Sequence, residues 1–257
     1  MINICDIYRA KIPRSSSVIL IGPGLEEHIR GISEIPARVP YDPGPLFFAT
    51  YLKGGTLHLF DRPELDYASL QNFFDYWRKL GTRLCTIRFI PGDMRLQADR
   101  RNLIEEGDTK RKDVVIIDHL TFSRHIAPYI IFDLGEKLYP PQVDVWQYFA
   151  QIYKGLLGMH SGKIIMHFED SHWQVTLRER MKKAFSSEGC SVKILEGIED
   201  SYRLDDEHIW EMVERRMIES ARFNLQAQQI VPTHSSKSIL IAEPILSIND
   251  NLTLHAI

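Results

Sequence analysis

Short runs of apolar residues alternate with amphipathic segments along most of the chain. The apolar runs are rich in β-branched and leucyl residues, which is typical of strands buried on both faces of a sheet. Strands are predicted at 17–21, 56–60, 84–90, 113–117, 163–168, 191–195 and 237–243. Helices are predicted between them, at 25–35, 45–53, 67–80, 94–106, 143–158, 173–188 and 204–222. This alternation predicts an α/β fold whose sheet has about seven mostly parallel strands, with helices on both faces.

The first predicted strand stops at Gly22-Pro23-Gly24. Glycine directly after a buried strand lets the backbone turn sharply, and it lets a ligand approach where a side chain would block it. The same three residues would also make a tight turn in any α/β protein. The sequence therefore leaves two interpretations of this turn, a ligand-binding loop and a structural bend.

Three later strands end in acidic residues, which are Asp61, Asp93 and Asp118. Ligands of parallel sheets bind at the carboxyl ends of the strands, where these carboxylates are expected. Asp61 is a candidate acceptor for both hydroxyls of a ribose. Asp93 is a candidate acceptor for the amine of a base that packs on Met94. Each of these two aspartates is alternatively the N-cap of a following helix, which for Asp61 would begin near Pro63. The phosphate-binding pattern G-x-x-x-x-G-K-[ST] is absent, so no triphosphate cradle is predicted.

Six short segments follow one another at the ends of predicted strands or within them. They are 18–24 (VILIGPG), 57–61 (LHLFD), 91–94 (PGDM), 113–119 (DVVIIDH), 162–168 (GKIIMHF) and 238–243 (SILIAE). In their order and spacing, these segments resemble the Rossmann-like S-adenosylmethionine-dependent methyltransferases. The resemblance implies a three-layer Rossmann-like sheet in a single domain over 1–257. It also implies an insertion at 25–44 and two segments that cover the acceptor, at 120–141 and 197–235.

The resemblance further implies that S-adenosyl-L-methionine is the cofactor. The implied cofactor-binding residues are Gly22, Pro23, Gly24, Asp61, Arg62, Asp93, Met94 and Asp118. His119 is the candidate catalytic base, because a hydroxyl or ammonium acceptor gains from losing a proton. His125 and His167 are further candidates for this role. The alternative is that His119 is an ordinary histidine at a strand end and that His167 faces the core.

The chain departs from the family pattern at three places. Leu20 stands where the family has an acid in the first strand, and Leu25 and Glu26 stand where its third glycine would be. Asp61 follows Gly24 by 37 positions, whereas the interval in such folds is about twenty. This excess is why residues 25–44 are interpreted as an insertion, in which Asp42 is a candidate for the missing carboxylate, as is Glu26.

Methyl transfer to an unidentified acceptor, with a small molecule as the favoured class, is the function that the resemblance implies. The tetrad N/D-P-P-Y/F, used for methylating amino groups of nucleic-acid bases, is absent. The alternative is a non-catalytic Rossmann-like binding or scaffolding protein. It is considered because Leu20 replaces the acid that the family has in its first strand. A NAD-dependent oxidoreductase is less favoured, because the pattern G-x-G-x-x-G is incomplete.

Composition adds few constraints. The chain has 257 residues, of which 44% are hydrophobic and 25% charged, and a formal net charge of −3. This charge gives no support for nucleic-acid binding, and the basic run 109–112 (TKRK) is typical of a solvated turn. The three cysteines are far apart, so no metal site is predicted and a reducing, cytoplasmic setting is favoured. No apolar run is long enough to span a membrane. The sequence is compatible with a monomer and with a homo-oligomer.

Overall fold

The computed structural model of the chain describes a core of strands and helices. The described residues are 2–22, 44–61, 63, 67–93, 96, 98–99, 102–103, 112–117, 145–157, 162–169, 172–199, 204, 211 and 237–245. Their strands are β1 (Ile2–Asn3), β2 (Ser17–Ile21), β3 (Thr56–Asp61), β4 (Thr86–Pro91), β5 (Val114–Ile117), β6 (Lys163–Glu169), β7 (Cys190–Glu199) and β8 (Lys237–Pro244). Their helices are α1 (Ile4–Lys11), α2 (Gly44–Tyr51), α3 (Tyr67–Lys79), α6 (Val145–Gly155) and α7 (His172–Ser187).

Within the described residues the strands form one eight-stranded sheet in the order β1-β7-β8-β6-β5-β2-β3-β4. The five strands from β6 to β4 in this order are parallel to one another. β8 lies between β6 and β7 and is antiparallel to both. The predicted α/β class with a mostly parallel sheet is confirmed, and all seven predicted strands are present. One further strand, β1, was not predicted. It pairs in parallel with the end of β7.

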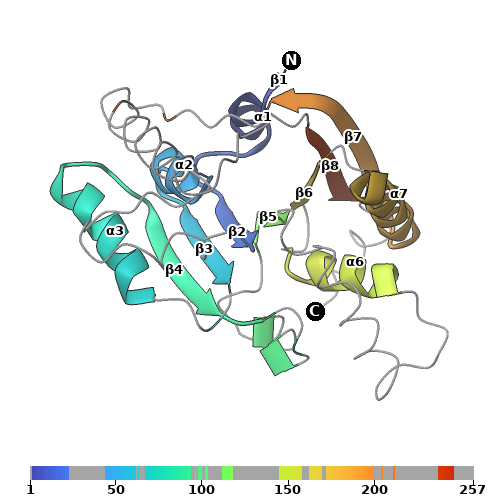
Figure 1. Ribbon diagram of the computed structural model, residues 1–257, viewed down its shortest axis with the longest axis horizontal. Helices are drawn as coiled ribbons and strands as arrows, with labels where there is room; N and C mark the ends of the chain where they lie inside the picture. Colours follow the sequence, from blue (N-terminus) through green and yellow to red (C-terminus); the bar gives the residue numbers. More distant parts are fainter. Residues whose placement is uncertain are drawn as a thin grey trace, which may run out of the picture.

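The helices cover both faces of this sheet (Figure 1), as predicted, and each face has its own core. Successive side chains of a strand point to opposite faces. Accordingly, Val18 and Leu20 belong to the core that contains α1, α2 and α3, together with Phe48. Ile19 and Ile21 belong to the core that contains α6 and α7. The apolar residues 18–21 of β2 therefore contribute to both cores, one on each face of the sheet.

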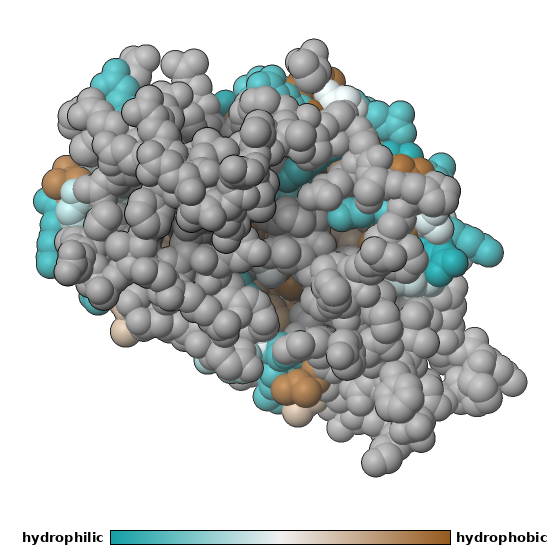
Figure 2. Space-filling view, viewed as in Figure 1, coloured by the Kyte–Doolittle hydropathy of each residue, from teal (hydrophilic) through white to brown (hydrophobic). Residues whose placement is uncertain are grey.

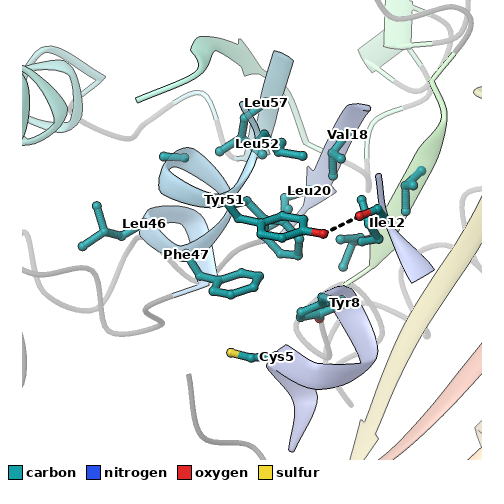
Figure 3. Close-up of a cluster of buried hydrophobic side chains, with 14 of the residues drawn as sticks. Cys5, Tyr8, Ile12, Val18, Leu20, Leu46, Phe47, Tyr51, Leu52 and Leu57 are labelled. Carbon is teal, nitrogen blue, oxygen red and sulfur yellow. Dashed lines mark hydrogen bonds between the residues drawn. The ribbon is translucent and has the colours of Figure 1, made fainter. Parts of the chain in front are cut away.

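The first helix, α1, lies in a segment for which no element was predicted. Its apolar positions Ile4, Cys5 and Tyr8 are fully buried, and their spacing is helical. Figure 3 shows Tyr8 close to Phe47 of α2, and the hydroxyl of Tyr51 donates to the carbonyl of Ile12 at 2.6 Å. The charged residues of this short segment obscured a pattern that the apolar residues alone would have shown.

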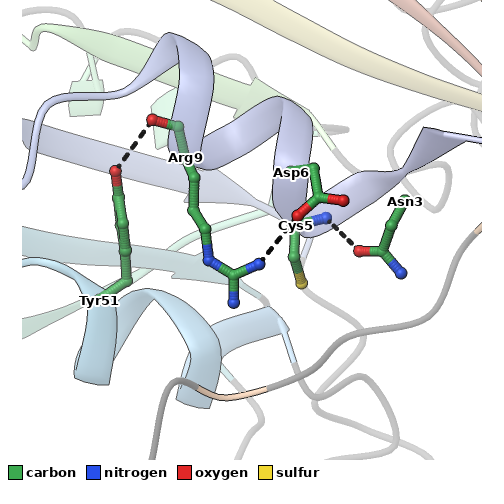
Figure 4. Close-up of polar contacts among 5 residues, drawn as sticks. All are labelled: Asn3, Cys5, Asp6, Arg9 and Tyr51. Atoms are coloured by element: carbon green, nitrogen blue, oxygen red, sulfur yellow. Dashed lines mark hydrogen bonds and ion pairs between the residues drawn. The ribbon is translucent and has the colours of Figure 1, made fainter.

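Polar contacts fix both ends of α1 (Figure 4). At its start, the side-chain oxygen of Asn3 accepts a hydrogen bond from the backbone N–H of Cys5 at 2.8 Å, which is an N-cap. Arg9 donates to Asp6 at 3.1 Å along the exposed side of the helix. The hydroxyl of Tyr51 also reaches the carbonyl of Arg9 at 3.4 Å. The helix is therefore tied to α2 by hydrogen bonds as well as by apolar contacts.

The interpretation of 109–112 as a solvated turn is wrong for its last residue. Lys112 is buried, and its Nζ lies 3.0 Å from Nε2 of His58 on β3. The backbone N–H of Lys112 donates to the carbonyl of Leu156 at 2.9 Å, at the end of α6. A buried ammonium needs a hydrogen-bond acceptor, and the His58 ring nitrogen meets this need. Lys112 therefore joins the entry of β5 to β3 and α6.

The described surface visible in Figure 2 is mostly hydrophilic, with separate apolar spots. The large apolar side chains that are exposed among the described residues are Ile2, Leu80, Leu96 and Ile245. They belong to four different parts of the chain, and single exposed apolar residues are ordinary on protein surfaces. Among the helices in the described ranges, none has the length and apolar character that crossing a bilayer requires.

Cys5, Cys85 and Cys190 are free thiols, and all three are buried. Burial raises the pKa of Cys85 from its ordinary 9.0 to about 11, and it also raises the pKa of Cys190. Because the thiolate is the reactive form, we expect slow reaction of the folded protein with Ellman's reagent at pH 8. In denaturant three equivalents should react at once. A thiol that reacts immediately in the folded protein would contradict the buried placement.

Candidate functional site

The candidate site lies where the strand order reverses. From β2 the chain proceeds outward through β3 and β4, and it then returns to place β5 on the other side of β2. Ile21 of β2 is level with Phe60 of β3 and with Ile117 of β5, so these strands end together. Ligands of open parallel sheets bind at the carboxyl ends of strands beside such a reversal. The ends of β2, β3 and β4 hold three of the residues predicted to bind a cofactor.

Gly22 directly follows β2 and has a φ of 67°, a conformation that favours glycine over residues with a side chain. Its backbone N–H donates to the carbonyl of Phe60 at 3.0 Å. This bond extends the ladder between β2 and β3 by one residue. Gly22 therefore has the positive φ that glycine permits after a buried strand, and it is joined to the end of β3, whereas the rest of the predicted turn lies outside the described residues.

Asp61 is the last residue of β3, and only 9% of it is exposed. Its backbone carbonyl accepts two hydrogen bonds, from the N–H of Gly92 at 2.8 Å and from the hydroxyl of Tyr67 at 2.7 Å. The next helix, α3, begins at Tyr67, so Asp61 does not stand at its N-cap position. The capping alternative thus does not apply to α3, and the ribose interpretation stays a prediction.

Asp93 lies two residues beyond β4, and it is buried. Its backbone N–H donates to Oδ2 of Asp99 at 2.7 Å, and its carbonyl accepts from the N–H of Leu96 at 2.9 Å. Gly92, just before it, lies against the ring of Phe60, and a Cβ at this position would be 2.6 Å from a ring carbon. Only glycine fits there without movement, so the turn after β4 is set closely onto β3.

Two backbone hydrogen bonds connect these three strand ends. Gly22 bonds to Phe60, the residue before Asp61, and Asp61 bonds to Gly92, the residue before Asp93. The structure therefore brings Gly22, Asp61 and Asp93 to adjacent positions on neighbouring strands. The other predicted site residues lie outside the described residues: Pro23, Gly24, Arg62, Met94, Asp118, His119 and His125.

His167, a lower-ranked candidate base, is placed elsewhere. It lies on β6, which β5 separates from β2. Its ring is buried, and Nε2 is hydrogen-bonded to the hydroxyl of Tyr8 on α1. This contact agrees with the interpretation of His167 as a core residue, because the pair joins α1 to the sheet.

Sequence reasoning assigned no role to Tyr67 or Asp99, although both bond to the turns of the candidate site. Tyr67 opens a predicted amphipathic helix, where an aromatic residue is ordinarily a core residue. Asp99 falls in a polar segment rich in charged residues, so its carboxylate does not stand out. No signal in the sequence distinguished either residue.

The site offers acceptors for a ligand that carries hydroxyl and amine donors. Ionised carboxylates only accept hydrogen bonds, and the site places two aspartates, Asp61 and Asp93, at neighbouring strand ends. Among the described residues, no group of three or more histidine, cysteine, aspartate or glutamate side chains could hold a metal ion. The described part of the site therefore holds two buried aspartates, residues of a type that accepts hydrogen bonds from hydroxyl and amine groups, and a glycine without a side chain beside them.

No protein-family model matches this sequence, and no curated protein matches it. Several solved structures are similar to the chain. A precorrin-6y C5,15-methyltransferase from Geobacter metallireducens GS-15 has a TM-score of 0.45 and 11% identity, over 90% of this chain and 81% of that one. M. jannaschii TYW2, solved in complex with AdoMet, has a TM-score of 0.40 and 11% identity, over 94% and 74%. The plantazolicin methyltransferase BamL, solved with SAH, has a TM-score of 0.37 and 13% identity, over 89% and 77%. The fold and the site described above rest on contacts within this chain.

Proposed function

We propose that this chain binds S-adenosyl-L-methionine and transfers its methyl group to a small-molecule acceptor. The observation that carries the proposal is the hydrogen-bonded connection of Gly22, Asp61 and Asp93 across three neighbouring strand ends. The sequence resemblance assigns these residues to the cofactor. Their adjacency gives that assignment a common location beside the reversal of strand order.

Each of the three residues has a task that its chemistry suits. Gly22 has no side chain, so it leaves room for the amino-acid part of the donor next to β2. The carboxylate of Asp61 would accept hydrogen bonds from both ribose hydroxyls, and the carboxylate of Asp93 would accept one from the amine of adenine. When bound, S-adenosyl-L-methionine supplies a methyl group already activated on a sulfonium, so the protein contributes mainly alignment and exclusion of water. His119 stays the predicted base for an acceptor that must lose a proton.

The strand order supports this proposal over a NAD-dependent oxidoreductase. The order β4-β3-β2-β5-β6 matches the first five positions of the doubly wound order 3-2-1-4-5-6. The next strand in space, however, is the antiparallel β8. A mostly parallel sheet with an antiparallel strand at this place is typical of the methyltransferase fold.

A non-catalytic binding protein is the second candidate function. Leu20 favours it, because this residue is buried within β2 and leaves no carboxylate where the family has an acid. The two candidate functions differ in whether the chain binds S-adenosyl-L-methionine and whether this binding needs Asp61.

Titration with S-adenosylhomocysteine, the donor product, tests the proposed function. We expect saturable heat in calorimetry and a rise in melting temperature, because a ligand that binds only the folded state stabilises it by about 2.7 kcal/mol at a hundred times its Kd. Titration with NADH, followed by fluorescence, serves as the control and should show no saturation. Absence of both heat and thermal shift at millimolar S-adenosylhomocysteine would contradict the proposal.

A further inference from the structure

The backbone around Asp93 is held by hydrogen bonds on both sides. Its N–H donates to Oδ2 of Asp99 at 2.7 Å, and its carbonyl accepts from Leu96 at 2.9 Å. The preceding residue, Gly92, donates to the carbonyl of Asp61 at 2.8 Å. The two peptide planes beside Asp93 are therefore both fixed, and they determine the direction in which its side chain leaves the backbone.

Asp99 is the only side chain among these hydrogen-bond partners. The 2.7 Å distance lies in the range of charge-assisted bonds between an N–H and a carboxylate. Asp99 also packs against the turn, since a Cβ built on Gly92 would lie 3.5 Å from the Cβ of Asp99. Phe60 lies against the same glycine. The turn is thus held between a buried ring on β3 and the carboxylate of Asp99.

We propose that Asp99 is a positioning residue that aims Asp93 at the base of the bound nucleoside and so sets specificity for adenine. This inference rests on the proposed function. Without Asp99, the N–H of Asp93 loses its acceptor in a buried turn, and the turn shifts to find another one. A carboxylate that reads an exocyclic amine loses its selectivity when it is displaced, because hydrogen bonds weaken steeply with distance and angle.

The test compares two ligands that differ only at the base. S-adenosylhomocysteine carries an amine on C6 of its purine, whereas S-inosylhomocysteine carries an oxygen there and cannot donate from it. We expect the natural protein to prefer the adenosine ligand by at least about tenfold in Kd, which corresponds to about 1.4 kcal/mol. In Asp99→Ala the affinity for the adenosine ligand should fall by about tenfold while that for the inosine ligand stays unchanged, so the preference disappears.

Two further variants separate positioning from general damage. Asp99→Asn keeps an acceptor oxygen at the same reach and should retain most of the preference. Asp75→Ala removes an exposed carboxylate of α3 that bonds to Gln71 and Arg78, and it should leave both affinities unchanged. If Asp99→Ala does not fold, Asp99→Glu serves in its place. The longer glutamate side chain keeps the charge but displaces the carboxylate, so it should reduce the preference.

The possible outcomes distinguish this inference from the proposed function. If the natural protein binds neither ligand, the proposed function fails, and this inference fails with it. If it binds both ligands equally, or if Asp99→Ala weakens both by the same factor, the positioning role alone is overturned. An unchanged preference in Asp99→Ala, or in Asp99→Glu where that variant replaces it, also overturns it. Loss of preference in Asp99→Ala, with retention in Asp99→Asn, supports it.

Discussion

Asp61→Ala is expected to weaken binding of S-adenosylhomocysteine by roughly 30- to 1,000-fold, or about 2–4 kcal/mol. The size follows from the loss of two hydrogen bonds between a carboxylate and the ribose hydroxyls, each made away from bulk water. Binding is measured by calorimetry beside the natural protein. The structural bonds of Asp61 to Gly92 and Tyr67 use its backbone carbonyl, and alanine preserves them. The melting temperature should therefore change much less than the affinity.

Asp61→Asn and Asp75→Ala complete this experiment. Asparagine keeps one acceptor oxygen but replaces the other with a donor, so its affinity should fall between those of the natural protein and Asp61→Ala. Asp75→Ala removes a surface carboxylate from α3 and should bind the ligand normally. If Asp61→Ala binds as tightly as the natural protein, Asp61 does not hold the ribose.

The elements that the sequence predicted well are those whose pattern is local. Residues 18–21 of β2 and all residues of β5 are apolar because both faces of these strands are buried. The start of α2 beside Pro45 and the end of α3 near Gly81 also follow from local signals. These signals depend on neighbouring residues alone, so they can be recognised before the fold is known.

The features that escaped prediction depend on distant contacts. The hydrophobic pattern of residues 237–243 suits a strand of either direction. Nothing in it therefore specifies that β8 is antiparallel to β6 and β7. The helix α1 forms because Tyr8 and Ile4 pack into a core that residues far along the chain complete. Lys112 lies in a basic run that is typical of a solvated turn, and its burial depends on its contact with His58 on β3. In each case the deciding contact joins residues far apart in the sequence, such as Tyr51 and Ile12, which are 39 positions apart, and Lys112 and His58, which are 54 apart.

The candidate site was predicted in part for the same reason. Glycine and aspartate at strand ends are local signals, and the parallel sheet brings them to one edge. The bond between Asp61 and Gly92 requires the register of β3 against β4, which no local pattern gives. Asp99 takes its place only after the turn at Asp93 has formed. The sequence therefore predicts residues for contact with a nucleoside, and the structure adds Tyr67 and Asp99, which bond to the backbone of two of them.

Gly92→Val is expected to destabilise the fold by about 2–3 kcal/mol, the typical cost of forcing extra volume into a packed interior. A Cβ at this position would lie 2.6 and 2.7 Å from two ring carbons of Phe60. The ring is only 2% exposed, so it cannot move outward without disturbing the core around it. The free energy of unfolding is measured by urea denaturation at equilibrium. Gly155→Val is the matched control, because nothing lies within 4 Å of the added Cβ there, and its stability should change little.

A double variant that combines Gly92→Val with Phe60→Ala tests whether the Phe60 ring causes the loss of stability in Gly92→Val. Phe60→Ala alone leaves a cavity and destabilises the protein, but it also removes the atoms that meet the new side chain. The double variant should therefore be more stable than the sum of the two single effects predicts, by at least about 1 kcal/mol. Additive effects would show that the cost of Gly92→Val arises elsewhere. In that case the contact between Gly92 and Phe60 does not set the turn that carries Asp93 toward the end of β3.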